Sequence, residues 1–241
     1  VANLLAQGAI GVSEDIAARL RRRLPFTSVR CIRNGLDLER VASTVDGRQM
    51  RQELGIPVDA FVVGSVGRLT PIKGIEYLIR AFGLLARGGE AQCSRLIITG
   101  EGPLRLSLEQ LAKEQGVAAR VVFLGERRDV YRVMRAFDLF ALPSLHEGVP
   151  MVLLEAMAIG VPIVASGVGG ISEVVTDGKE ASLVPPQDPH AIAKAIRTIR
   201  ASTELRERMI EAARHRVQAQ FSIRNTAGLV RDMYRELLAA G

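Results

Sequence analysis

The chain has 241 residues, of which 48% are hydrophobic and 24% charged. This length and composition fit one large globular domain, or one domain and part of another, and argue against a disordered chain. No run of apolar residues is long enough to span a bilayer, so the sequence predicts no membrane-spanning helix. The N-terminal residues do not have the pattern of a signal peptide, so none is predicted.

The net charge of +6 predicts an anionic partner: a nucleotide diphosphate, an anionic lipid surface or a nucleic acid. Aromatic residues make up only 4% of the chain and tryptophan is absent, so stacking on nucleic acid bases is disfavoured. Cys31 and Cys93 show no metal-ligand spacing and are expected to be free thiols. We expect a cytoplasmic protein; the basic residues 19–23 leave open a peripheral contact at the inner membrane face.

Apolar periodicity and the positions of Gly, Pro and capping residues predict an alternating series of helices and strands. Helices are expected at 14–23, 49–54, from Gly74, from Pro103 to about 114, and at 129–136, 150–159, 189–201, 203–220 and 222–238. A strand-like run is expected at 29–32, and core strands at 60–66, 95–99, 121–124, 138–142, 161–165 and 182–184. Six core strands alternating with helices predict an α/β fold with a doubly wound, Rossmann-like parallel sheet.

Residues 143–166, PSLHEGVPMVLLEAMAIGVPIVAS, predict a glycine turn, a helix and a buried strand. The helix start offers unpaired backbone N–H groups and the positive end of the helix dipole, which suit a phosphate. Glu147 and Glu155 suit the acceptance of hydrogen bonds from hydroxyl groups. Taken singly, either glutamate can be a solvated surface residue. An unpaired carboxylate within the apolar helix segment around Glu155 is costly, however, which favours a binding role.

The segment GRLTPIKG places Arg68 and Lys73 between a predicted strand and a predicted helix. An arginine fork and a lysine point charge at the carboxyl end of a strand suit a diphosphate, although a pair of surface cations gives the same pattern. A second pattern, Gly100 and Gly102, lacks the third glycine of a dinucleotide fingerprint because Arg105 occupies that place. A dehydrogenase is therefore disfavoured.

Glu147 and Glu155, within S-x-x-EG-x-P-x-V-x-x-EAMA-x-G-x-P-x-V-A, resemble the E-x7-E signature of the retaining family 4 (group 1) glycosyltransferases. G-R-L-x-x-x-K-G resembles the donor-phosphate element of the same family, and RNGLDLERV resembles its interdomain linker. A fourth segment, GGISEVVTDGKEA, resembles the family pattern GG-x-x-E-x-x-x-D-G-x-x-G, with Ala181 where glycine is usual. That departure puts one turn conformation in doubt.

The resemblance implies the C-terminal half of a GT-B fold. It implies that Glu155 binds the ribose of a nucleotide-sugar donor and that Glu147 orients the sugar that is transferred. The implied catalytic residues are Glu147, Arg68 and Lys73. The implied donor-binding residues are Gly67, Arg68, Lys73, Arg127, Glu147, Gly148, Val149, Pro150, Met151, Val152 and Glu155. No metal and no cofactor are expected, the nucleotide-sugar of UDP or GDP type being a substrate.

The resemblance also implies a domain organisation. Residues 1–40 are expected to be the tail of an N-terminal acceptor domain and the interdomain linker, and residues 41–221 the nucleotide-sugar-binding domain. Residues 222–241 are expected to form a helix that crosses back to the N-terminal domain, with Leu229, Met233 and Leu237 on one stripe. If that domain is absent, the stripe should be exposed.

The implied reaction transfers a hexosyl group from a nucleotide diphosphate to a hydroxyl of a sugar or lipid-linked acceptor, with retained configuration, as in polysaccharide or glycolipid biosynthesis. Three alternatives remain open: a nucleotide-sugar epimerase, a phosphorylase of the same fold, and a non-catalytic module that binds nucleotide-sugar. Nucleic acid is not expected as a partner. Without the N-terminal domain, the chain is expected to bind donor weakly and not to catalyse transfer.

Overall fold

The computed structural model describes residues 7–42, 47–89 and 93–239. The strands are β1 (Gly8–Gly11), β2 (Ser28–Cys31), β3 (Phe61–Val66), β4 (Ser94–Thr99), β5 (Val121–Gly125), β6 (Leu139–Leu142), β7 (Ile163–Ser166) and β8 (Ser182–Val184). The α-helices are α1 (Glu14–Arg23), α2 (Leu38–Ala42), α3 (Gly47–Glu53), α4 (Ile75–Arg87), α5 (Arg105–Glu114), α6 (Val130–Met134), α7 (Met151–Ile159), α8 (Ile171–Val174), α9 (Pro189–Ala201), α10 (Thr203–Gln220) and α11 (Ile223–Ala239). Two short 3-10 helices, Pro71–Lys73 and Ala118–Arg120, complete the set.

A parallel sheet of six strands, in the order β5-β4-β3-β6-β7-β8, forms the centre of the molecule. The chain adds β4 and β5 on one side of β3 and then returns to place β6, β7 and β8 on the other side. This confirms the predicted doubly wound sheet. The direction of winding reverses between β3 and β6, and ligands of such sheets bind outside the carboxyl ends of the strands at that point.

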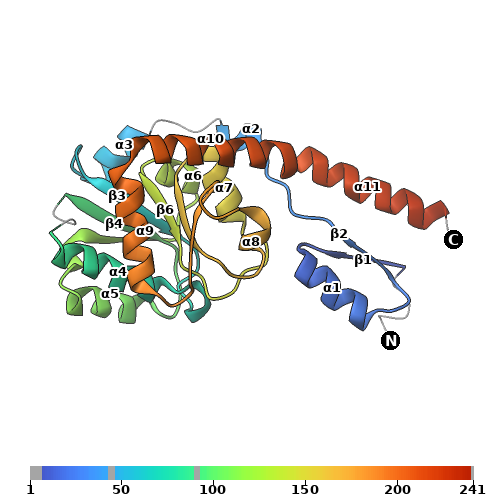
Figure 1. The fold of residues 1–241 in the computed structure, drawn as a ribbon, viewed down its shortest axis with the longest axis horizontal. Helices are drawn as coiled ribbons and strands as arrows, with labels where there is room; N and C mark the ends of the chain where they lie inside the picture. Colours follow the sequence, from blue (N-terminus) through green and yellow to red (C-terminus); the bar gives the residue numbers. More distant parts are fainter. Residues whose placement is uncertain (1–6, 43–46, 90–92, 240–241) are drawn as a thin grey trace.

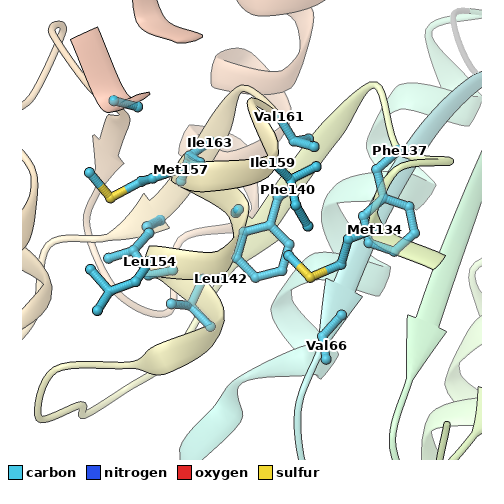
Figure 2. Packing of buried hydrophobic residues seen from close by; sticks show 14 of the residues in the cluster. Val66, Met134, Phe137, Phe140, Leu142, Leu154, Met157, Ile159, Val161 and Ile163 are labelled. Carbon is cyan, nitrogen blue, oxygen red and sulfur yellow. The ribbon is translucent and has the colours of Figure 1, made fainter. Parts of the chain in front are cut away.

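Helices cover both faces of the sheet (Figure 1). One apolar layer, drawn in part in Figure 2, includes buried side chains of α6, α7 and α10, represented by Met134, Leu154 and Val217. The other layer includes side chains of α4, α5 and α9, represented by Phe82 and Ile196. Because both faces are covered, the strands are mostly apolar, and this explains why their sequences do not alternate between polar and apolar residues.

A two-stranded parallel sheet, β1 and β2, lies with α1 apart from the six-stranded sheet, and α11 extends toward it (Figure 1). The apolar stripe of α11, expected to be exposed in a chain without the N-terminal domain, is exposed only in part. Met233 is 5% exposed, because a methyl group of Met233 and one of Leu237 lie against Gly8 of β1. Leu229, nearer the start of the helix, is 50% exposed. The chain thus covers one end of this stripe with its own N-terminal strand, while the domain division at residues 40 and 221 stays a prediction.

Two further expectations are settled by the backbone. Helix α5 begins at Arg105 with Leu104 as its N-cap, so Pro103 lies in the preceding turn and does not open the helix. Ala181 is fully buried and does not have a positive φ, so its position does not require glycine. Within the described residues, no helix combines the length and the apolar character needed to cross a membrane.

Gly170→Ala is expected to lower the free energy of unfolding by about 1–3 kcal/mol, because an added Cβ would lie 1.9 Å from the Gly148 carbonyl oxygen. Gly228→Ala on α11 is the matched control: its added Cβ would contact nothing within 4 Å. That change should raise the free energy of unfolding by about 0.5–1 kcal/mol, as Ala replaces Gly within a helix. Urea denaturation measures both, and equal stability of the two variants would contradict the close approach.

Candidate functional site

An ion pair joins the loops that follow β3 and β6, at the point where the sheet reverses its winding. Lys73 Nζ lies 2.6 Å from Glu147 Oε1, and the side chains are only 20% and 10% exposed. The two residues are 74 positions apart in the chain. The structure therefore brings together two of the three residues predicted as catalytic.

Close contacts between backbones hold these loops together. Gly74, at φ 61°, lies so close to the Pro143 carbonyl oxygen that a Cβ would be 2.1 Å from it. The Leu145 N–H donates to the Ile72 carbonyl oxygen at 2.8 Å. Only glycine tolerates both the left-handed backbone and this contact. Lys73 is thereby held beside the loop that carries Glu147.

A third loop, after β7, closes on the same segment. Gly169, at φ 50°, would place a Cβ 2.2 Å from the Glu147 carbonyl oxygen, and the Gly170 N–H donates to that oxygen at 3.0 Å. Glycines at positions 169 and 170 are compatible with close approach to a ligand or with a tight turn. In the structure they permit close approach of two protein backbones, which fixes the position of Glu147.

The first turn of α7 presents backbone N–H groups without acceptors. Pro150 is the N-cap and offers no side-chain hydrogen bond, and the first backbone hydrogen bond of the turn runs from the Leu153 N–H to the Pro150 carbonyl oxygen. The N–H groups of Gly148, Val149, Met151 and Val152 donate to no described residue. Such a helix start binds anions. Ile16 of α1 lies near this helix start, since its Cδ1 would be 3.7 Å from a Cβ at Gly148.

Arg68 is exposed and forms no ion pair with any described residue. It follows Gly67, over which the aliphatic part of Lys73 passes, since a Cβ at Gly67 would lie 3.7 Å from Lys73 Cδ. Among the described residues Arg68 thus has no carboxylate partner, whereas the neighbouring Lys73 forms an ion pair with Glu147. Arg68, Lys73 and Glu147 together carry more positive than negative charge, which suits an anionic ligand.

Glu155 is partly buried in the apolar helix α7, and burial raises the pKa of its carboxyl group. The Tyr131 hydroxyl of α6 donates a long hydrogen bond of 3.4 Å to Glu155 Oε1, and it partly offsets this effect on the pKa. Burial and the neighbouring Glu155 in turn raise the pKa of Tyr131. A half-buried carboxylate with one weak donor retains the capacity to accept from further hydroxyl groups.

Arg127 is the predicted site residue whose side chain is already engaged. Its guanidinium donates to both oxygens of Asp129, at 2.8 and 2.7 Å, and this bond holds the pKa of Asp129 below its usual range. The Arg127 side chain is therefore engaged within the protein, and its role in donor binding stays a prediction.

The pattern of Gly100 and Gly102 has a packing role. A Cβ at Gly100 would lie 2.0 Å from the Gly67 carbonyl oxygen, and one at Gly102 would lie 2.5 Å from the Leu69 carbonyl oxygen. The loop after β4 therefore packs against the loop that carries Arg68. This agrees with the sequence argument against a dinucleotide fingerprint.

Sequence reasoning assigned no role to three residues whose contacts the structure shows near this site, although Glu173 matched the pattern GG-x-x-E. Ser144 is fully buried and donates to Glu147 Oε1, and Tyr131 reaches Glu155. Glu173 of α8 accepts from the N–H groups of Glu14 and Asp15 at the start of α1, and pairs with Arg33. The serine of S-x-x-E was the available signal for Ser144. Contacts between residues more than a hundred positions apart left no signal for the role of Glu173.

Glu155→Gln is expected to raise the melting temperature at neutral pH, because it removes a buried charge whose pKa is raised. Above the raised pKa the carboxylate is charged and costs stability. Below the ordinary carboxyl pKa it is protonated in both folded and unfolded states, and the cost vanishes. The gain should therefore shrink as the pH falls through the raised pKa, as measured by thermal unfolding at a series of pH values.

Glu180→Gln is the matched control. Glu180 is 2% exposed, but it accepts from the Thr176 N–H at 2.8 Å and from Arg216 at 3.4 Å. Its removal should lower the melting temperature at neutral pH, since it leaves the partly buried Arg216 guanidinium without its carboxylate partner. A loss of stability in both variants would show that Glu155 is a structural residue.

Residues 46–216 match the family described as glycosyl transferases group 1. Over 238 residues the chain is 36% identical to D-inositol 3-phosphate glycosyltransferase of Saccharomonospora viridis, with 95% of this chain and 54% of that protein covered. It is 33% identical over 191 residues to alpha-D-kanosaminyltransferase of Streptomyces kanamyceticus, with 78% of this chain and 49% of that protein covered. The chain spans about half the length of the curated relatives it matches.

Two solved structures show the same fold. HepE of Anabaena, in complex with UDP and glucose, matches with a TM-score of 0.88 and 28% identity, covering 97% of this chain and 64% of that chain. Sucrose-phosphate synthase from Thermosynechococcus elongatus matches with a TM-score of 0.85 and 30% identity, covering 100% of this chain and 61% of that chain. Since the family match covers well over half of the sequence, the chain belongs to the group 1 glycosyltransferases, with the Rossmann-like sheet of their GT-B fold.

Proposed function

We propose that this chain is the donor-binding part of a retaining hexosyltransferase that uses a nucleotide diphosphate sugar. One observation carries the proposal: the Lys73–Glu147 pair lies beside the unbonded N–H groups of α7, at the switch point of the sheet. A site that combines cations, free backbone N–H groups and carboxylates suits a ligand with a diphosphate between two groups that carry hydroxyls.

In this proposal the diphosphate lies between Arg68, Lys73 and the first turn of α7. These groups meet the negative charge that grows on the leaving diphosphate as its bond to the anomeric carbon breaks. They thereby perform the electrostatic task that a divalent cation performs in other enzymes of phosphate chemistry. No metal ion or cofactor is required in the proposed reaction.

The two glutamates take the hydroxyl groups of the donor. Glu155 accepts from the ribose, and Glu147 accepts from the hexose that is transferred. The acceptor oxygen forms its bond to the anomeric carbon on the face that the diphosphate leaves, so the configuration is retained. The proton of the acceptor hydroxyl passes to an oxygen of the departing phosphate. No general base from this chain is therefore needed.

A uridine or guanosine diphosphate is the proposed donor type. HepE of Anabaena, which shares the fold at 28% identity, was solved with UDP and with UDP-glucose, and this supports uridine as the first candidate. One relative has an acceptor, D-inositol 3-phosphate, in its name, whereas the name of the kanosaminyltransferase gives only the sugar that is transferred. The acceptor is therefore proposed only as a hydroxyl of a sugar or lipid-linked compound. Its binding site is assigned to a preceding domain, because the chain spans about half of its relatives.

Two other functions use the same donor site. A nucleotide-sugar epimerase or phosphorylase of this fold would convert or phosphorolyse a glycosyl group instead of transferring it to an acceptor hydroxyl. A regulatory module would bind nucleotide-sugar without turnover. Relatives named as transferases favour transfer, and analysis of the products decides among the three.

Titration calorimetry of the chain with UDP, GDP and ADP tests the site. One nucleotide should bind, and Arg68→Ala and Lys73→Ala should each weaken it about tenfold or more, the effect of losing a charge-assisted hydrogen bond. Lys113→Ala is the control, because Lys113 is an exposed cation of α5 away from these loops. Equal weakening by all three substitutions would point to a general charge effect.

Activity provides the second readout. The chain by itself should release no sugar to an acceptor, whereas a form extended by the preceding domain should do so. Absence of nucleotide binding in both forms would contradict the proposed function. Robust transfer by the 241-residue chain would contradict its assignment as the donor-binding part alone.

A further inference from the structure

Ser144 is a buried side chain that contacts the carboxylate at the centre of the site. It is 0% exposed, and its hydroxyl donates to Glu147 Oε1 at 2.7 Å. The same oxygen accepts from Lys73 Nζ at 2.6 Å. Glu147 Oε2, by contrast, accepts from no described residue. The two oxygens of one carboxylate are therefore in different states.

The loop around Ser144 is fixed on both sides. Pro143 packs against Gly74, and the Leu145 N–H donates to the Ile72 carbonyl oxygen. A hydroxyl held in this way is a donor at a set position. Lys73, in contrast, is a point charge on a flexible stem, which attracts the carboxylate without fixing its rotation. Two donors at different positions on one oxygen restrict the plane of the carboxylate.

We propose that Ser144 is a positioning residue for Glu147. Together with Lys73 it occupies Oε1 and turns Oε2, as a hydrogen-bond acceptor, toward the hydroxyl groups of the transferred sugar. This inference rests on the proposed function, because it requires Glu147 to face the sugar of a bound donor. It assigns Ser144 an effect on recognition of the sugar and none on recognition of the nucleotide.

The test compares a nucleotide with its sugar conjugates. Calorimetry with UDP, UDP-glucose, UDP-N-acetylglucosamine, GDP and GDP-mannose first identifies the conjugate that the unaltered chain binds more tightly than the free nucleotide. In Ser144→Ala that preference should fall about fivefold, the effect of one lost hydrogen bond, while affinity for the free nucleotide stays within about twofold. Ser144→Cys keeps the size of the side chain with a weaker donor and should give an intermediate fall.

Ser65→Ala is the matched control. Ser65 is 1% exposed, and its hydroxyl donates to the Ala141 carbonyl oxygen at 2.8 Å, within the sheet. This variant loses a buried hydroxyl without touching Glu147, so the preference for the conjugate should not change. A double-mutant cycle adds a second readout: in a Glu147→Gln chain, Ser144→Ala should have little further effect on the preference.

The following results decide whether Ser144 positions Glu147. An unchanged preference in folded Ser144→Ala, or equal weakening of nucleotide and conjugate, overturns the positioning role. An unaltered chain that binds nucleotide but never prefers a conjugate also overturns it, while the nucleotide site stands. Absence of all nucleotide binding removes the proposed function itself. If Ser144→Ala does not fold, Ser144→Cys replaces it in the comparison of ligands and in the double-mutant cycle with Glu147→Gln.

Discussion

The arrangement of the site depends on backbones that approach one another more closely than any Cβ would allow. Gly74 lies on the Pro143 carbonyl, and Gly169 and Gly170 lie on the carbonyls of Glu147 and Gly148. These contacts join the loops after β3, β6 and β7 into one unit. The strands supply rigid anchors, and the glycines let the loops meet above them. The Lys73–Glu147 ion pair is a consequence of this packing.

Burial of such a pair is poorly explained by stability alone. Side chains that are 20% and 10% exposed lose most of their hydration, and the attraction between them offsets little more than this cost. Glu155 is costlier still, because its neighbour Tyr131 donates only a long hydrogen bond. Buried charges that cost stability are typical of binding sites, where the same groups later contact a ligand. These charges lie at the switch point of the sheet, where such a site is expected.

The N-terminal unit of the chain is joined to this site through Glu173. Its carboxylate accepts from the first N–H groups of α1 and pairs with Arg33, while Ile16 of the same helix lies near Gly148. At the far end, α11 packs on β1 through Met233. Two contacts at opposite ends thus place the β1–α1–β2 unit beside the loop after β6 and helix α8.

The sequence by itself determined the six core strands, their parallel sheet and the ends of α7, because apolar runs, Gly160 and Pro150 are local signals. It also identified Lys73, Glu147 and Glu155 as chemically notable. Only the tertiary structure decided which oxygen of Glu147 is occupied, and that the glycines pack against protein. These facts depend on contacts between residues tens of positions apart, whose distances no local pattern specifies.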